Sequence, residues 1–216
     1  MIYTCSYKNY NNDNKKGLDI TYNCGRNVNY LGNCFPTLAP NQYTIKNYLA
    51  SKELLDEESN IKMFIENYYD QTLKRLDPSE IYNIINNKVL LGYEDNMEFS
   101  NRHIVAAWLE IFLEEEIIEI KFDNDKLTLV EKPIYIKEML ESYIRETTNT
   151  RGFNSLRALY LYNKSLEYEI EATSLENNSG NPNNQLIEMA YLLRQNAAET
   201  EELYNLKNIK KKKIFK

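Results

Sequence analysis

Hydrophobic and polar positions in the first half of the chain follow the pattern of an α/β protein. Short apolar or alternating runs at 2–6 and 18–23 have the length of β-strands. A third run, 89–93, is apolar throughout, which is typical of a strand covered on both faces. Between the second and third runs, apolar residues recur at helical spacing over 61–76. Strands separated by helices favour a small parallel or mixed sheet with flanking helices.

Two helices of this half have clear start signals. Asp77 can cap a helix that begins at Pro78, and Glu80 completes a capping box. Ser100 can cap the next helix. The buried face of that helix is expected at Ile104, Val105, Trp108, Leu109 and Phe112. The polar residues before it therefore lie where a strand ends and a helix begins, which is where open α/β folds bind ligands.

The pattern changes near residue 115. Apolar runs at 117–122 and 126–130 flank Asp-Asn-Asp, which predicts a β-hairpin. Helical spacing then recurs in three further segments. The expected helices cover about 134–146, 152–172 and 185–206. The predicted organisation is an α/β domain at 1–115, a C-terminal hairpin and helical extension at 116–206, and a basic tail at 207–216.

Composition limits the class of protein. With 216 residues, of which 43% are hydrophobic, the chain can bury one core, or one core and a small module. It has no run of 18 apolar residues, so we expect no membrane span. The start lacks the pattern of a signal peptide, and three cysteines do not suggest a disulfide framework. A cytoplasmic protein is expected.

Charge is distributed unevenly. The formal net charge is −6, and the segment 207–216 carries six lysines and no acid, which leaves −12 for the remainder. An acidic body disfavours nucleic acid and anionic membrane surfaces. The tail is the one segment expected to touch a phosphate backbone or a neighbouring copy, and the alternative is a solvated terminus.

The residues that follow the third predicted strand are candidates for chemistry. Glu94 could act as a general base, or it could simply pair with Arg102. The free N–H groups of a helix start attract anions, so Ser100, Asn101 and Arg102 could cradle a phosphate, or the segment could be an ordinary cap. His103, the only histidine, could be an acid/base or a structural group.

Other polar residues follow the first two predicted strands. Thr4 and Ser6 are expected to reach a ligand from the first strand, and Tyr93 could stack on a nucleobase. Arg26 follows the second predicted strand, where Gly25 permits a tight turn. Its guanidinium could clamp a phosphate in bidentate fashion, or it could be an ordinary surface arginine.

Metal and cofactor motifs are missing from the sequence. Cys5, Cys24, Cys34 and His103 could in principle bind zinc, but their spacing contains no Cys-x-x-Cys pair. The sequence also lacks phosphate-binding and dinucleotide-binding glycine motifs and a nucleophile elbow. We therefore expect neither a metal site nor a cofactor.

Three blocks of the first half carry a resemblance to a known family. They are the opening Ile-Tyr-Thr-Cys-Ser-Tyr, the Leu-Ala-Pro at 38–40, and the stretch 89–109. Residues 1–114 resemble the domain of unknown function 488 family, in the short form of Gram-positive bacteria and their phages. That family usually reads Leu-Leu-Cys-Tyr-Glu, then Phe-Cys-His-Arg-His, then Val-Ala-x-Trp-Leu.

The departures from this pattern bear on function. Gly92 and Ser100 stand where the family has cysteines, and Asn101 stands where it has a histidine. A thiolate is a far better nucleophile than an unactivated hydroxyl, so the resemblance implies a pocket that binds rather than one that catalyses.

The expected function is the binding of a small anionic, nucleotide-like ligand by a degenerate catalytic site. A phage protein that sequesters a host nucleotide or immune signal would fit this expectation. One alternative is a hydrolase or glycosyl-transferring enzyme that acts on a nucleotide or base and uses Glu94. Another is a protein-interaction module, which would bind a partner or a second copy through 134–206.

Overall fold

A computed structural model describes residues 1–11, 16–28, 30–123, 126–179 and 182–214. The chain forms two compact units, Met1–Glu146 and Thr147–Lys216. This boundary lies later than the one expected near residue 115, because the predicted hairpin is part of the sheet of the first unit.

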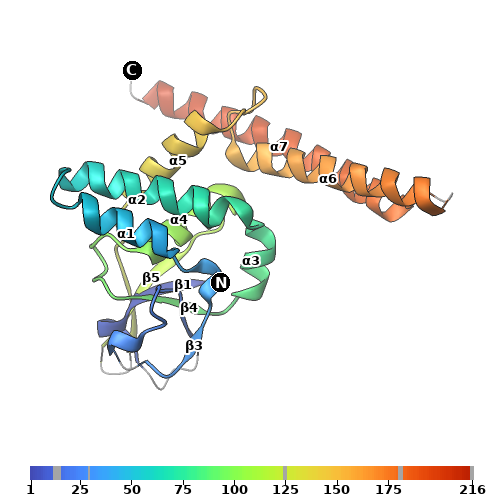
Figure 1. Ribbon diagram of the computed structural model, residues 1–216. Coiled ribbons are helices and arrows are strands. Elements are labelled where there is room, and N and C mark those ends of the chain that lie inside the picture. The colour runs from blue at the N-terminus through green and yellow to red at the C-terminus, as the bar shows by residue number, and fades with distance from the viewer. Residues whose placement is uncertain (12–15, 29, 124–125, 180–181, 215–216) are drawn as a thin grey trace. The chain divides into compact units, whose positions relative to one another are not determined.

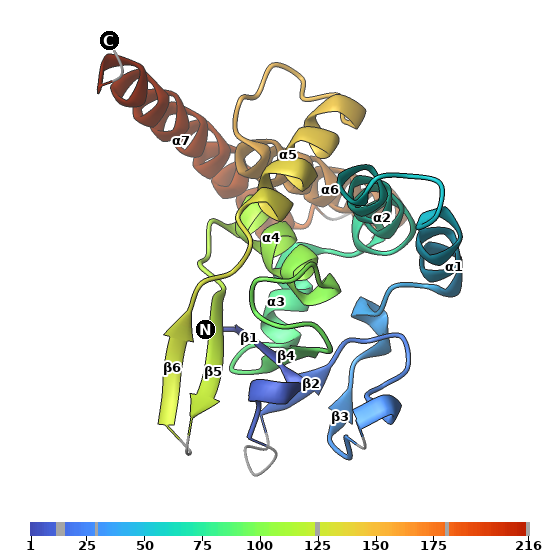
Figure 2. The ribbon, with the colours of Figure 1, turned by 90° about the vertical axis from the view of Figure 1, so that its left-hand side faces the viewer.

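The first unit is built on a six-stranded mixed sheet, so the α/β prediction is confirmed. The strand order is β3-β2-β4-β1-β5-β6, and every neighbouring pair is parallel except β5 and β6. Figure 2 shows β5 and β6 side by side at one edge. The strands are β1 (Tyr3–Ser6), β2 (Gly17–Asp19), β3 (Asn33–Cys34), β4 (Val89–Gly92), β5 (Ile118–Asp123) and β6 (Lys126–Val130).

Helices of the first unit lie together on one side of this sheet (Figures 1 and 2). The α-helices are α1 (Gln42–Ser51), α2 (Glu57–Gln71), α3 (Pro78–Ile84), α4 (Asn101–Leu113) and α5 (Tyr135–Thr147). Helix α4 is buried around nearly its whole circumference, from Asn101 to Ile111. It lies against α3 and against β1 and β4 of the sheet, and its side chains can reach the strand ends.

Tyrosines from loops cover the other side of the sheet. The buried core on that side of the sheet consists of Cys5, Tyr10, Val89, Leu91 and Ile120. Tyr3, Tyr7, Tyr30, Ile118 and Phe122 pack against this core. Aromatic rings shield these short strands without a covering helix, and the hydroxyl at the end of a tyrosine ring can reach the rim.

Local signals set several of these elements. Asp77 caps α3 as predicted, since its Oδ1 accepts a hydrogen bond from the Glu80 N–H at 3.0 Å. The second strand is shorter than predicted because Asp19 Oδ1 accepts a 2.6 Å hydrogen bond from the Thr21 N–H, which turns the chain. Helix α1 was not predicted, although Asn41 caps it through the Thr44 N–H.

The second unit is a helical hairpin of α6 (Leu156–Ser179) and α7 (Asn184–Ile214), which lie side by side (Figure 1). Buried small residues recur every seven positions on both helices and allow the backbones to approach closely. They are Ala158, Ser165 and Ala172 on α6, and Ala190 and Ala197 on α7. Helix α7 continues past the predicted end at Leu206, so much of the segment 207–216 is helical.

None of the helices in the described ranges has both the length and the apolar character needed to cross a membrane.

The cap of α3 provides a test of the fold. Replacement of Asp77 by alanine leaves the Glu80 N–H without its acceptor, and we expect a loss of about 1 kcal/mol in the free energy of unfolding. Urea denaturation measures this loss. Asp77→Asn keeps a side-chain oxygen and should retain most of the stability, so an equal loss in both variants would contradict the capping role.

Candidate functional site

The centre of the parallel sheet contains a point where the direction of winding reverses. Strands β1 and β4 are neighbours, but the chain leaves β1 toward β2 on one side and leaves β4 toward β5 on the other. Such switch points are the usual ligand sites of open α/β sheets. The residues at this edge are Ser6, which ends β1, Tyr7, which follows it, and Tyr93 and Glu94 after β4.

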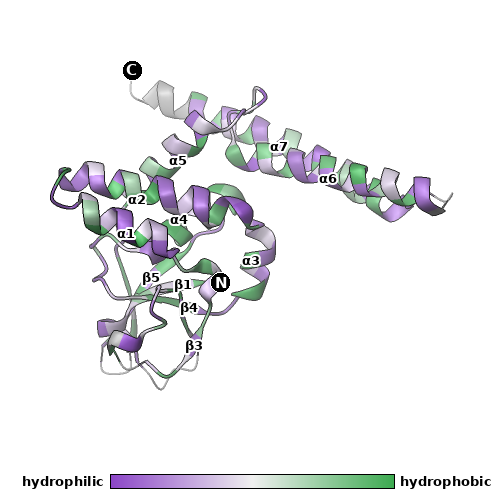
Figure 3. Ribbon diagram, in the orientation of Figure 1, coloured by the Kyte–Doolittle hydropathy of each residue, from purple (hydrophilic) through white to green (hydrophobic). Residues whose placement is uncertain are grey.

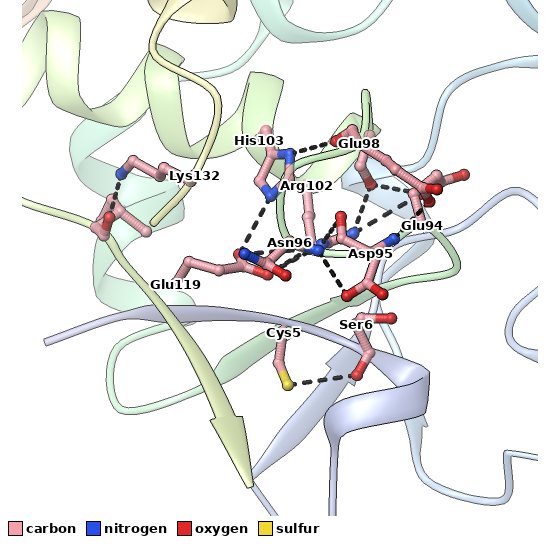
Figure 4. Close-up of polar contacts among 12 residues, drawn as sticks. Cys5, Ser6, Glu94, Asp95, Asn96, Glu98, Arg102, His103, Glu119 and Lys132 are labelled. Atoms are coloured by element: carbon pink, nitrogen blue, oxygen red, sulfur yellow. Dashed lines mark hydrogen bonds and ion pairs between the residues drawn. The ribbon is translucent and has the colours of Figure 1, made fainter. Parts of the chain in front are cut away.

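Arg102 is the charged centre of this region. Its side chain is completely buried, and Figure 4 shows it among acidic groups. Nη2 lies 2.9 Å from Glu119 Oε1 and 3.0 Å from the Asp95 carbonyl, while Nη1 donates to Ser100 Oγ at 2.9 Å. Nε also donates to Glu119, at 3.3 Å. These contacts engage all three nitrogens, so Arg102 is not free to clamp a phosphate.

Gly92 makes room for this guanidinium. A Cβ at this position would lie 2.8 Å from Ser100 Oγ and 2.9 Å from Arg102 Nη1, closer than real side chains approach. Any side chain at position 92 would therefore displace the Ser100 hydroxyl or the Arg102 guanidinium. The absence of a side chain at 92 and the buried position of Arg102 are coupled.

Glu119 and His103 complete the buried charge cluster. Glu119 lies on β5, paired in register with Thr4, and its Oε2 is 3.2 Å from His103 Nε2. Burial opposes ionisation of Glu119, but the His103 hydrogen bond and the Arg102 charge outweigh it and hold the pKa below its usual range. Thus Glu119 is the counter-ion of the buried arginine.

His103 is held at both ring nitrogens. Nδ1 lies 3.1 Å from the Glu98 carbonyl and Nε2 faces Glu119. These oxygen atoms favour the protonated ring, but burial disfavours it more strongly, so the pKa lies below the ordinary value of 6.5. His103 is almost completely buried and serves the internal network.

Glu94 is the exposed end of the same network. Its Oε2 accepts a 2.6 Å hydrogen bond from Ser100 Oγ and lies 3.8 Å from Arg102 Nη1. The Glu94 side chain is 39% exposed, whereas that of Arg102 is fully buried. A fixed carboxylate at the strand end, with one side open, can act as an acid/base or bind a donor group of a ligand.

The other predicted residues have different environments. Ser100 occupies the N-cap position of α4, but its side chain makes no cap hydrogen bond because Glu94 and Arg102 engage it. Asn101 Nδ2 donates to the Ile20 carbonyl at 2.7 Å, so this amide joins α4 to the chain after β2. Arg26 is exposed in the short helix η2 (Arg26–Val28).

Several hydroxyls near the switch point are buried without a hydrogen-bond partner. In the described part of the chain, these include Thr4 Oγ1 and the phenol oxygens of Tyr7 and Tyr93. The Tyr7 ring lies 5.3 Å from the Tyr93 ring and 5.4 Å from the Tyr30 ring, between centroids. Ser6 Oγ is used locally, since it accepts from the Lys8 N–H at 3.3 Å.

Sequence reasoning missed two buried carboxylates. Glu119 stands between Ile118 and Ile120, and Asp19 stands between Leu18 and Ile20. A single acid in an apolar strand was the available signal, because such a group must find a partner once it is buried. The partners themselves are far away in the sequence and could not be identified from it.

Asp19 belongs to a second cluster, at the ends of β2 and β3. Its carboxylate oxygen and the sulfurs of Cys24 and Cys34 all lie within 4.8 Å of one another, which makes them candidates for a metal ion. Cys5 belongs instead to the apolar core, and burial raises the pKa of its thiol to about 12. Of the four residues weighed as zinc ligands from the sequence, Cys24 and Cys34 lie together, while Cys5 lies in the core and His103 faces Glu119.

The second unit carries exposed apolar residues. Figure 3 shows hydrophobic and hydrophilic residues interspersed along α6 and α7. Ile170, Tyr191 and Leu203 are 70%, 64% and 58% exposed. A role of 134–206 in binding a partner or a second copy stays a prediction.

Comparisons of the chain with models of protein families, with curated proteins and with solved structures find no match. The resemblance drawn from the three sequence blocks therefore stays a prediction.

The ion pair in the centre of the site leads to a stability prediction. Glu119→Gln leaves the buried guanidinium of Arg102 without its counter-ion, and we expect the free energy of unfolding to fall by about 3 kcal/mol. Chemical denaturation measures the change. The matched variant Glu94→Gln removes a partly exposed charge and should cost less than about 1 kcal/mol. Equal losses in the two variants would contradict the assignment of Glu119 as the counter-ion.

A pH dependence follows from the single histidine. Because the pKa of His103 is lower in the folded chain than in the unfolded chain, the unfolded state binds more protons below the ordinary value of 6.5. Stability should therefore fall as the pH is lowered from about 7.5 to about 5.5. His103→Asn should remove that part of the fall in unfolding measurements, and an unchanged slope would show that other groups cause it.

Proposed function

We propose that the first unit binds a small anionic, nucleotide-like ligand at the carboxyl ends of β1 and β4. The observation that carries this proposal is the pair of buried phenol oxygens, on Tyr7 and Tyr93, that lack hydrogen-bond partners at the switch point. Buried polar groups are nearly always satisfied, and a molecule bound at this switch point would complete the hydrogen bonds of these two hydroxyls.

Aromatic rings support a planar ligand group. Tyr7 contacts both Tyr30 and Tyr93, so three rings from separate loops gather at the same edge. Phenol rings can pack against a nucleobase or a nicotinamide ring, and their hydroxyls can bind its polar edge.

The positive groups available for a phosphate are at the rim. Arg102 is committed to Glu119, and its charge is not available to a ligand. Lys8 is exposed directly after Tyr7. Arg26 is exposed directly after Gly25, at which a Cβ would lie 2.9 Å from the Tyr7 hydroxyl. These two cations therefore border the tyrosine cluster, and a phosphate in this place would meet them rather than the buried guanidinium.

Binding without turnover fits the composition of the site. No thiol stands at Gly92 or Ser100, and the hydroxyl of Ser100 is held by Glu94 and Arg102. His103 is buried and faces Glu119 rather than the rim. A nucleophile with an adjacent free base is the usual arrangement for covalent catalysis, and these residues do not supply it. Sequestration of a nucleotide or signal is the role that this arrangement supports.

Glu94 favours a second candidate function. It is fixed by Ser100 and remains partly open at the strand end. A hydrolase or glycosyl-transferring enzyme that acts on a nucleotide could use this carboxylate as its acid/base. Glu94→Gln would then abolish turnover of a bound nucleotide and leave its affinity within a few-fold, whereas a binding protein would show no turnover before or after the change.

A panel of nucleoside phosphates, cyclic dinucleotides and NAD derivatives tests the binding proposal. Thermal-shift assays on the full chain should identify at least one stabilising compound. With that compound, Tyr7→Phe and Tyr93→Phe should each lower the affinity about tenfold in calorimetry, because each removes one hydrogen bond to the ligand. Tyr93→Phe should not lower the stability of the free protein, since that hydroxyl has no partner to lose. The Tyr7 phenol faces the Asp19 carboxylate, so the affinity of Tyr7→Phe is compared with its own stability.

Tyr68→Phe is the matched control. The Tyr68 hydroxyl is buried, donates to the Leu38 carbonyl and lies beside Asn101, which itself donates to the Ile20 carbonyl. This variant should lower stability and leave the affinity unchanged. The proposal fails if no compound of the panel shifts the melting of folded protein, or if Tyr68→Phe weakens binding as much as the other two variants do.

A further inference from the structure

We propose that Asp19, Cys24 and Cys34 bind a single zinc ion. Their ligand atoms lie within 4.8 Å of one another, and Cys34 Sγ is 3.9 Å from Asp19 Oδ2. Ligands of a tetrahedral zinc ion lie about 3.5 Å apart when each is 2.0 to 2.3 Å from the metal, so a small inward movement would complete the site. The proposal is independent of the nucleotide-like ligand.

The backbone around the three residues holds them in place. Asp19 is completely buried, and its Oδ1 accepts a hydrogen bond from the Thr21 N–H at 2.6 Å. The other carboxylate oxygen, Oδ2, therefore faces the cysteine sulfurs. Thr21 Oγ1 in turn accepts from the Gly25 N–H at 3.3 Å and fixes the turn that carries Cys24. The Phe35 N–H donates to the Asp19 carbonyl at 2.7 Å and fixes the position after Cys34. Hydrogen bonds of this kind around a ligand set orient it before the metal arrives.

The turn between β2 and β3 has an unusual backbone. Cys24 and Gly25 both have positive φ, at 48° and 64°. A left-handed conformation is unfavourable for cysteine, and here it places a second sulfur beside Asp19 and Cys34. The Cys34 sulfur also lies 3.8 Å from the Cys24 carbonyl. The fold thus brings together three residues that are 5 and 10 positions apart in the sequence.

The chemistry of the three groups selects the class of metal. Two sulfurs and one carboxylate favour zinc over magnesium or calcium, which prefer oxygen ligands alone. Both thiols must lose their protons on binding, so two protons are released for each ion bound. Without a metal, burial and the neighbouring Cys24 raise the pKa of Cys34 to about 12, which makes this thiol a poor nucleophile by itself.

Three protein ligands leave one position of a tetrahedral ion open, as in catalytic rather than structural zinc sites. The Tyr7 hydroxyl borders the same space. A Cβ at Gly25 would lie 2.9 Å from this hydroxyl and 3.1 Å from Asp19 Oδ2. This hydroxyl, which faces the Asp19 carboxylate, is placed to hydrogen-bond a water or ligand atom in the open position.

Metal titration of the full chain tests the proposal. Protein reduced and freed of metal by chelation should bind one Zn²⁺ per chain by calorimetry and elemental analysis. Co²⁺ in its place should give the visible bands of tetrahedral coordination and a sulfur-to-metal charge-transfer band. Asp19→Asn, Cys24→Ser and Cys34→Ser should each weaken binding at least about tenfold, whereas the control Cys5→Ala should retain it.

Alkylation of the unmodified protein gives a second measurement that does not depend on how the variants fold. Zn²⁺ should protect Cys24 from a maleimide reagent, as read by mass spectrometry of peptides, whereas Cys34 should react slowly even without the metal. The proposal is overturned if the reduced chain binds no Zn²⁺, or if binding survives loss of both cysteines. It is also overturned if the two cysteines form a disulfide in air and their reduced form shows no protection by Zn²⁺.

Discussion

The arrangement of the first unit depends on the buried ion pair between Arg102 and Glu119. A guanidinium without contact to water is tolerated only when its charge and donors are matched, and here four oxygen atoms, on Glu119, Ser100 and Asp95, accept from it. The pair joins helix α4 to strand β5 across β1. It also requires glycine at 92, because a side chain there would occupy the place of the guanidinium.

This pair divides the polar residues of the strand ends into two sets. Arg102, His103 and Glu119 form an internal network whose members satisfy one another. Tyr7 and Tyr93 keep unused hydrogen-bonding capacity at the rim. The internal set is used up by its own contacts, and the rim set is what a ligand would meet. The proposed zinc site adjoins the rim at Tyr7. The nucleotide-like ligand and the metal would both lie beside this side chain, while the other residues that hold them would differ.

The sequence predicted the region of the candidate site but not which side chains contact one another there. The stretch 89–109 was identified because strand and helix signals are local, and its strand and helix are confirmed as β4 and α4. Arg102 was a candidate for anion binding because it lies at a helix start, where free N–H groups attract anions. Its actual partner, Glu119, lies 17 positions later on another strand. Only the register between β1 and β5 brings that carboxylate beneath α4.

The sequence by itself determined the class of fold, the cap of α3, the hairpin of β5 and β6, and most helices, because periodicity and capping act over a few neighbouring residues. Tertiary structure decided which polar groups pair with one another and which keep unused hydrogen-bonding capacity. It paired Arg102 inward, left Tyr7 and Tyr93 without partners, and brought Asp19 to two cysteines. The physical reason is that the desolvation of a buried charge or hydroxyl must be offset by whichever group the packing places beside it, and sequence distance does not reveal that group.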